Sequence, residues 1–136
     1  MASHLLDTSV YCQPLKPRPL AGVISRWNLL GDAALATSVI ADAEVQFGLR
    51  LKASAKLWTA YQSILRGRIP SLIVDDLVGE SFAVLKEQQQ RKGQPRADLD
   101  LLIAATARRH QLIVATLNFK HFDGLDGVVA EDWSAP

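Results

Sequence analysis

The sequence predicts an α/β fold in which a short parallel sheet of about four or five strands carries helices on both faces. Short apolar runs of three or four residues recur along the chain, separated by segments with apolar residues at helical spacing. The runs are apolar throughout, which is typical of strands buried on both faces and not of an exposed antiparallel sheet. We therefore expect a three-layer sandwich.

Length and composition indicate a single domain that spans residues 1–136. Hydrophobic residues make up 49% of the chain, which is enough for a core at this size. The formal net charge is +1, so the overall charge indicates neither nucleic acid nor a membrane as a partner. No segment has the length and apolarity of a membrane span. The single cysteine, Cys12, excludes an internal disulfide, and we expect a cytoplasmic protein.

The first strand is expected within His4–Val10, an apolar run that ends at Asp7 and two hydroxyl residues. Three prolines then predict a surface loop over 13–19. Apolar residues at spacings of three and four predict a helix over 20–30 that ends at a glycine, and 34–37 reads as a second strand.

A hydroxyl residue, Ser38, is placed to cap a helix that runs to about Leu51. The stripe of Ile40, Phe47 and Leu51 predicts its buried face. The remaining elements are predicted as a helix over 56–65, a strand over 72–74, a helix from Asp75 or Asp76 into the polar run 86–92, an apolar helix over 97–110, a strand over 112–115 and an edge strand at 128–129.

Three carboxylates lie at positions that the sequence pattern predicts to be at least partly buried. Asp7 follows a buried strand, and in open parallel sheets the carboxyl ends of strands are where ligands bind. Glu44 has Ile40 and Phe47 as helical neighbours, and Asp100 lies in the most apolar helix. A carboxylate in such a place is protonated, paired or bound to a cation.

Two interpretations of these carboxylates follow. Each is either the buried partner of an Arg or Lys, or part of a site for a hard cation such as Mg²⁺ or Mn²⁺. In the second case the cation polarises a phosphoryl oxygen and lowers the pKa of a bound water. Asp98 stands where an N-cap would stand, and we expect it to cap the helix, with support of a metal ligand as the alternative.

Four motifs resemble the PIN-domain ribonucleases, and among them the VapC-type toxins of bacterial toxin-antitoxin pairs. They are 5–10 (LLDTSV), Ser38 to Ile40 with Glu44 and Gly48, 100–107 (DLLIAATA) and 116–122 (TLNFKHF). Their order and spacing follow the family over nearly the whole chain. The resemblance implies a PIN-like sandwich and a metal-dependent endoribonuclease that acts as a toxin, with RNA as substrate, a small antitoxin as partner and a homodimer as assembly.

The resemblance also implies roles for individual residues. Asp7, Glu44 and Asp100 match the catalytic, metal-binding carboxylates of the family, with Mg²⁺ or Mn²⁺ as the cofactor. Thr8 and Ser38 match positions that orient these carboxylates by hydrogen bonds. Asn118 matches a position that is Asp or Asn in relatives.

The chain departs from the family at position 121, where many relatives carry an acid and this chain has His121. Asp123, two residues further on, is the candidate to replace it, and a solvated loop residue is the other interpretation of Asp123. We therefore expect one firmly held ion and a second recruited with the RNA phosphate, and we expect substitution of Asp7 to be the most damaging. His121 is interpreted as a general acid or as a surface residue.

Basic residues near the predicted site are the candidates for RNA binding. Arg91, Lys92 and Arg96 precede the third motif. Lys120 follows Asn118 by two residues in the fourth motif. An ordinary solvated face is the alternative for each. Two other functions stay open: a phosphoryl-binding regulator, and a degenerate PIN scaffold that binds RNA or a protein without cleaving it.

Overall fold

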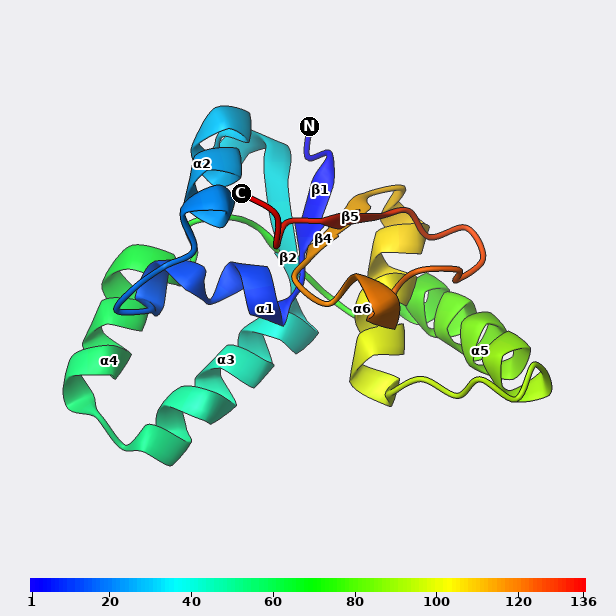
Figure 1. Cartoon of the computed structure of the whole chain (residues 1–136). Coiled ribbons are helices and arrows are strands. Elements are labelled where there is room, and N and C mark those ends of the chain that lie inside the picture. The colour runs from blue at the N-terminus through cyan, green and yellow to red at the C-terminus, as the bar shows by residue number, and fades with distance from the viewer.

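The computed structural model describes all residues, 1–136, and contains one five-stranded sheet in the order β3-β2-β1-β4-β5 (Figure 1). The strands are β1 (His4–Leu6), β2 (Leu35–Ser38), β3 (Ser71–Leu72), β4 (Ile113–Thr116) and β5 (Ala130–Asp132). Every neighbouring pair is parallel. The predicted fold class is confirmed, and β1 lies in the middle of the sheet.

The register brings three strand ends to one edge. Leu6 pairs with Thr37 on one side and with Ala115 on the other. The residues that follow these three positions are Asp7, Ser38 and Thr116. The carboxyl edge of the sheet therefore carries a carboxylate between two hydroxyl residues.

The helices fall on both faces of the sheet. They are α1 (Thr8–Tyr11), α2 (Ala21–Leu30), α3 (Val39–Lys52), α4 (Ala55–Ala60), a π-helical turn (Tyr61–Leu65), α5 (Asp76–Arg91) and α6 (Asp98–His110), with 3-10 turns at Gln13–Leu15, Asp32–Ala34 and Phe119–His121. None of the helices combines the length and the apolar composition of a membrane span.

Two hydrophobic clusters fill the space between the layers. Successive residues of a strand point to opposite faces, and Leu5 and Leu6 accordingly enter different clusters. Leu5 packs with residues of α5 and α6, such as Leu85 and Ile103. Leu6 packs with α1, α2 and the π-helical turn, and this cluster includes the buried Trp27 and Trp133.

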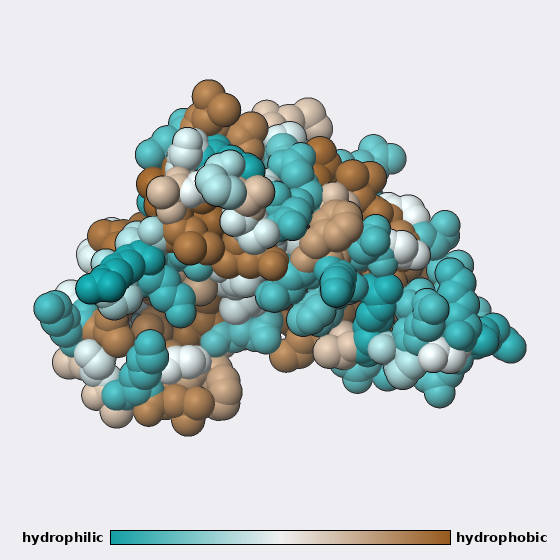
Figure 2. All heavy atoms as spheres, in the orientation of Figure 1, coloured by the Kyte–Doolittle hydropathy of each residue, from teal (hydrophilic) through white to brown (hydrophobic).

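The predicted buried face of α3 is wrong. Phe47 and Leu51 are 65% and 71% exposed, and the buried face is formed by Ala41, Val45 and Leu49. In Figure 1 the C-terminal half of α3 runs away from the sheet alongside α4, so the sheet does not cover its larger apolar side chains. Figure 2 shows apolar surface at this end of the molecule.

Three smaller predictions also differ from the structure. The third strand is Ser71–Leu72, and Ile73 lies outside it, largely exposed. The edge strand is Ala130–Asp132 and begins after Val129. The proline-rich segment starts with a 3-10 turn whose Gln13 is buried, because its side chain bonds the backbone of Ser9 and Leu20.

Candidate active site

The centre of the site is Asp7, which is 4% exposed at the carboxyl end of β1. Its Oδ1 accepts hydrogen bonds from the Ser9 hydroxyl at 2.6 Å and from the backbone N–H of Val10 at 3.1 Å. Its Oδ2 accepts from the Thr116 hydroxyl at 2.5 Å. The side chain also caps α1, so its orientation is fixed from three directions.

Ser9 and Thr116 are site residues that the sequence did not single out. The Ser9 hydroxyl accepts from the Leu117 amide at 3.0 Å, and the Thr116 hydroxyl accepts from the Asn118 amide at 2.8 Å. Both hydroxyls therefore join the end of β1 to the end of β4. The available signal was the polar ending of the fourth strand, which resembles that of the first.

Burial raises the pKa of Asp7 above its usual value of 3.8. The hydrogen bonds from Ser9, Thr116 and Val10 favour the charged form and oppose this shift, while the nearby charge of Asp100 adds to it. The carboxylate is thus short of positive charge. A cation beside it would stabilise the ionised form.

Glu44 lies in the second turn of α3 and is partly buried. Its Oε1 accepts a hydrogen bond of 2.6 Å from the hydroxyl of Thr8 in α1. No Arg or Lys pairs with it, so the alternative of a buried salt bridge does not hold for this residue.

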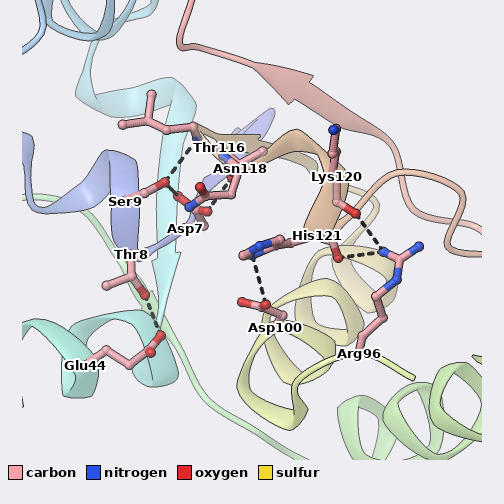
Figure 3. A network of polar contacts seen from close by, with 11 residues as sticks. Asp7, Thr8, Ser9, Glu44, Arg96, Asp100, Thr116, Asn118, Lys120 and His121 are labelled. Atoms are coloured by element: carbon pink, nitrogen blue, oxygen red, sulfur yellow. Dashed lines mark hydrogen bonds and ion pairs between the residues drawn. The ribbon is translucent and has the colours of Figure 1, made fainter. Parts of the chain in front are cut away.

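Asp100 lies in the first turn of α6, where the helix dipole favours a negative charge. Its side chain is 26% exposed, and its Oδ2 is 3.2 Å from Nδ1 of His121. Figure 3 shows Asp7, Glu44 and Asp100 directed from three elements toward one region, with the imidazole of His121 near Asp100.

Comparisons with known proteins give the family of this chain. The sequence matches the family model of the PIN domain over residues 4–127. The chain belongs to the PIN-domain family. It is 34% identical to Toxin FitB of Neisseria gonorrhoeae, over 95% of this chain and 97% of that protein. It is 33% identical to VapC ribonuclease Y4jK of Sinorhizobium fredii, over 90% and 93%.

Solved structures agree with this assignment to the PIN-domain family. FitAcB from Neisseria gonorrhoeae has a chain that superposes with a TM-score of 0.87 at 28% identity, covering 97% of this chain and 99% of that one. DNA-bound VapBC from Salmonella typhimurium gives 0.85 at 25% identity, over 98% and 99%. This PIN domain therefore resembles VapC-type toxins over its full length.

Two of the expected supporting residues take other places in this PIN domain. The Ser38 hydroxyl caps α3 by accepting from the Ala41 amide at 3.0 Å and makes no hydrogen bond to any of the three carboxylates. Asp98 is not the N-cap of α6, because Ala97 holds that position. Asp98 instead pairs with Lys86 at 2.9 Å on the surface, where an ion pair contributes little.

The turn after β4 carries Asn118, His121 and Asp123, which have different surroundings. Asn118 is exposed and precedes the 3-10 turn, beside an open recess of 390 Å³ that Lys120 and His121 also line. Asp123 is exposed, and its carboxylate has no hydrogen-bond or ion-pair partner; its backbone carbonyl accepts from Arg96 and its backbone N–H donates to the carbonyl of Phe119. His121, not Asp123, is the residue of this turn that faces Asp100.

The basic residues differ in how free they are. The Arg96 guanidinium donates to the carbonyls of Lys120, His121 and Asp123 at 3.2, 2.8 and 2.9 Å, so it holds the turn together. Arg91 pairs with Glu87 in the last turns of α5, and Lys92 follows it. Lys120 is exposed in the same turn, and in Figure 3 its amino group points away from Asp100.

The donor set is chemically suited to a hard cation, since carboxylate oxygens are the ligands that Mg²⁺ and Mn²⁺ take from proteins. Asp100 lies close enough to Asp7 for its charge to affect the Asp7 carboxyl. The side chains do not, however, converge into a closed set of three ligands. Binding of an ion by Asp7, Glu44 and Asp100 thus requires their side chains to turn inward.

Proposed function

We propose that this PIN domain is a divalent-metal-dependent endoribonuclease and the toxin of a toxin-antitoxin pair. The observation that carries the proposal is the placement of Asp7, Glu44 and Asp100 around one region at the carboxyl edge of β1. Relatives of the chain bear the names tRNA(fMet)-specific endonuclease VapC in Shigella flexneri and Ribonuclease VapC2 in Haemophilus influenzae. RNA phosphodiester bonds are the proposed substrate.

Each carboxylate has its own support. Asp7 is oriented by Ser9 and Thr116, Glu44 by Thr8, and Asp100 by the first turn of α6. Mg²⁺ or Mn²⁺ is the proposed cofactor; when bound, it supplies a Lewis acid for the phosphoryl oxygen and an acidified water. The neutral side chain of Asn118 and the absence of an acid at position 121 favour one tightly held ion, with a second recruited together with the RNA.

Lys120 is the proposed first contact for the RNA. This side chain is exposed and lines the recess at the end of β4, beside Asn118. Arg91 and Lys92 lie at the far end of α5, and Arg96 is occupied with backbone carbonyls. We therefore assign the first phosphate contact to Lys120.

The proposed partner is a small antitoxin, and a homodimer is the proposed assembly. The similar solved structures include FitAcB from Neisseria gonorrhoeae and DNA-bound VapBC from Salmonella typhimurium. In this chain a groove of 240 Å³ beside Glu44 is lined by apolar residues and by two lysines; the residues that form its wall include Leu15, Lys16, Leu49, Lys52 and Leu57. An antitoxin segment held there would reach the carboxylates. An RNA-cleaving protein of this kind acts in the cytoplasm.

The test is RNA cleavage by charge-neutral variants. Asp7→Asn and Asp100→Asn each remove one proposed ligand while keeping its volume, and we expect cleavage to be abolished with the fold retained in circular dichroism. Asp98→Asn is the matched control, because Asp98 lies two residues from Asp100 but pairs with Lys86 on the surface.

The double variant Asp7→Asn, Asp100→Asn separates the alternatives. Retained cleavage would refute the proposal. RNA binding without cleavage by the native protein, at saturating Mg²⁺ or Mn²⁺, would instead identify a degenerate PIN scaffold. A scaffold of that kind gains nothing from the three carboxylates, so their neutral variants would bind RNA equally well.

A further inference from the structure

The imidazole of His121 faces the proposed metal site. Its Nδ1 lies 3.2 Å from Oδ2 of Asp100, and in Figure 3 the ring points into the region between Asp100 and Asp7. The side chain of His121 is 54% exposed, whereas that of Asp100 is 26% exposed. One ring edge is thus free to meet solvent or a ligand while the ring stays beside the carboxylate.

The separation of these two atoms is near that of two ligands on one ion. Ligand atoms lie about 2.0 to 2.1 Å from a small divalent cation, for both nitrogen and oxygen donors. Two such ligands at a right angle are therefore about 2.8 to 3.0 Å apart. The observed 3.2 Å between Nδ1 of His121 and Oδ2 of Asp100 is slightly longer, and without a cation it is the distance of an ion pair when the imidazole is protonated.

The backbone that carries His121 is held on both sides. The Arg96 guanidinium donates to the carbonyls of Lys120, His121 and Asp123, and the next residue, Phe122, is 1% exposed in the core. A 3-10 turn, Phe119–His121, leads into this anchor. The imidazole is therefore presented to Asp100 by a fixed turn and not by a free loop.

We propose that His121 is a nitrogen ligand of the active-site cation, next to Asp100, and that the site consequently selects Mn²⁺ over Mg²⁺. The inference rests on the proposed function, since it concerns the same site. Imidazole suits transition metals, whereas Mg²⁺ prefers oxygen donors. A neutral ring in place of a carboxylate also reduces the negative charge that would attract a hard ion.

Arg96 has a corresponding role as a positioning residue. Its three bonds to carbonyls fix the turn but reach none of the carboxylates. Removal of the guanidinium would loosen the presentation of the His121 ring without removing a ligand. Arg96→Ala should therefore weaken Mn²⁺ binding less than His121→Ala does.

The experiment measures metal binding and coordination by the full chain, without RNA and at about pH 8, where an ordinary imidazole is neutral. Electron spin echo modulation of bound Mn²⁺ detects a coordinated ¹⁴N nucleus, and calorimetry gives the affinities for Mn²⁺ and Mg²⁺. The variants are His121→Ala, His121→Asp and Arg96→Ala. His110→Ala is the matched control, because His110 is exposed at the opposite end of α6.

We expect ¹⁴N modulation in the native protein and in His110→Ala, and none in the two His121 variants. The ratio of Mn²⁺ to Mg²⁺ affinity should fall about tenfold or more in His121→Asp, which supplies oxygen in place of nitrogen. Circular dichroism checks that these variants of an exposed residue keep the native fold.

The outcomes separate the two levels of the proposal. Mn²⁺ binding that Asp100→Asn abolishes, but that shows no ¹⁴N modulation, would overturn the role of His121 and leave the proposed function intact. An affinity ratio that stays unchanged in His121→Asp would do the same for the selectivity. Absence of any divalent binding by the native protein, with or without RNA, would refute the proposed metal site itself.

Discussion

Thr116 donates its hydroxyl hydrogen to Oδ2 of Asp7 at 2.5 Å, and this bond joins the ends of β4 and β1. Both residues are buried, so neither group can exchange its partner for bulk water. The same Thr116 oxygen accepts from the Asn118 amide. One hydroxyl therefore fixes both the central carboxylate and the turn that leads to His121.

Thr116→Val tests this bond, because valine keeps the shape and removes the hydroxyl. We expect a loss of about 1–3 kcal/mol of folding free energy, since a buried carboxylate and an amide lose a partner. Mn²⁺ affinity should fall about 10- to 100-fold, as for other groups that orient a metal ligand. Thermal unfolding and calorimetry measure both effects. Thr116→Ser should restore them, and a valine variant with native affinity would contradict the role.

Asp7→Asn should stabilise the metal-free protein at neutral pH. The pKa of Asp7 is raised in the fold, so folding favours its protonated form. The stability from this group is complete below the unfolded value of about 3.9 and is lost as pH rises through the folded pKa. The neutral amide avoids that loss. Thermal melts from acid to neutral pH should show an advantage of Asn that grows with pH.

Addition of Mn²⁺ supplies the control for this comparison. A cation bound to Asp7 stabilises the native carboxylate but gains less from the amide. The advantage of Asp7→Asn should therefore shrink or reverse with metal. A variant that is less stable than the native chain at every pH without metal would show that burial does not dominate the energetics of Asp7.

A second hydrogen-bond network, away from the site, joins α3 to two buried tyrosines. Asp42 in α3 accepts from the hydroxyl of Tyr11 at 2.9 Å and from that of Tyr61 at 2.7 Å. Burial, followed by the bond to Asp42, raises the pKa of Tyr61 to about 12. Asp42→Ala should lower the free energy of unfolding by about 2–4 kcal/mol, because it leaves two tyrosine hydroxyls without their hydrogen-bond acceptor. It should also lower the Tyr61 pKa.

Urea unfolding measures the first effect of Asp42→Ala, and ultraviolet titration of tyrosine measures the second. Asp123→Ala is the control, since that side chain is exposed in the turn after β4. Equal stability of the two variants would show that the tyrosine network does not hold α3 in place.

Lys120→Ala should weaken RNA binding. Removal of one phosphate contact reduces the steepness of the plot of log K against log[salt] by about 1. The measurement uses fluorescence anisotropy in an Asp7→Asn background, so that the RNA is not cleaved. Arg91→Ala removes an equal charge that pairs with Glu87 far along α5 and should leave the slope unchanged. Equal slopes in both variants would remove Lys120 from the RNA path.

Local patterns predicted several elements well. The N-cap Ser38 is where the sequence places it, Asp75 is one of the two caps that the sequence allows for α5, and α2 ends at Gly31. These features depend on a few consecutive residues whose backbone groups need partners. The face of α3 was not predicted, because Phe47 is apolar enough for a core but lies where the helix extends beyond the sheet.

Charged groups show the same limit. Asp98 has the sequence position of a cap, yet Lys86 from the preceding helix provides a partner on the surface. Arg96 has the positive charge expected of an RNA contact, yet its guanidinium donates to three backbone carbonyls of a turn that is distant in sequence. Both outcomes depend on a neighbour that is remote in sequence. The spacing of residues along the chain does not predict such a neighbour.

The sequence by itself determined that Asp7 follows an apolar strand and that Glu44 and Asp100 have apolar neighbours on their helices, because these features depend on residues within a few positions of each carboxylate. Only the tertiary structure decided which groups meet these carboxylates: Thr116 at Asp7, Thr8 at Glu44 and His121 at Asp100. Strand order and helix rotation set those contacts. They depend on the packing of the whole chain, which a local pattern does not encode.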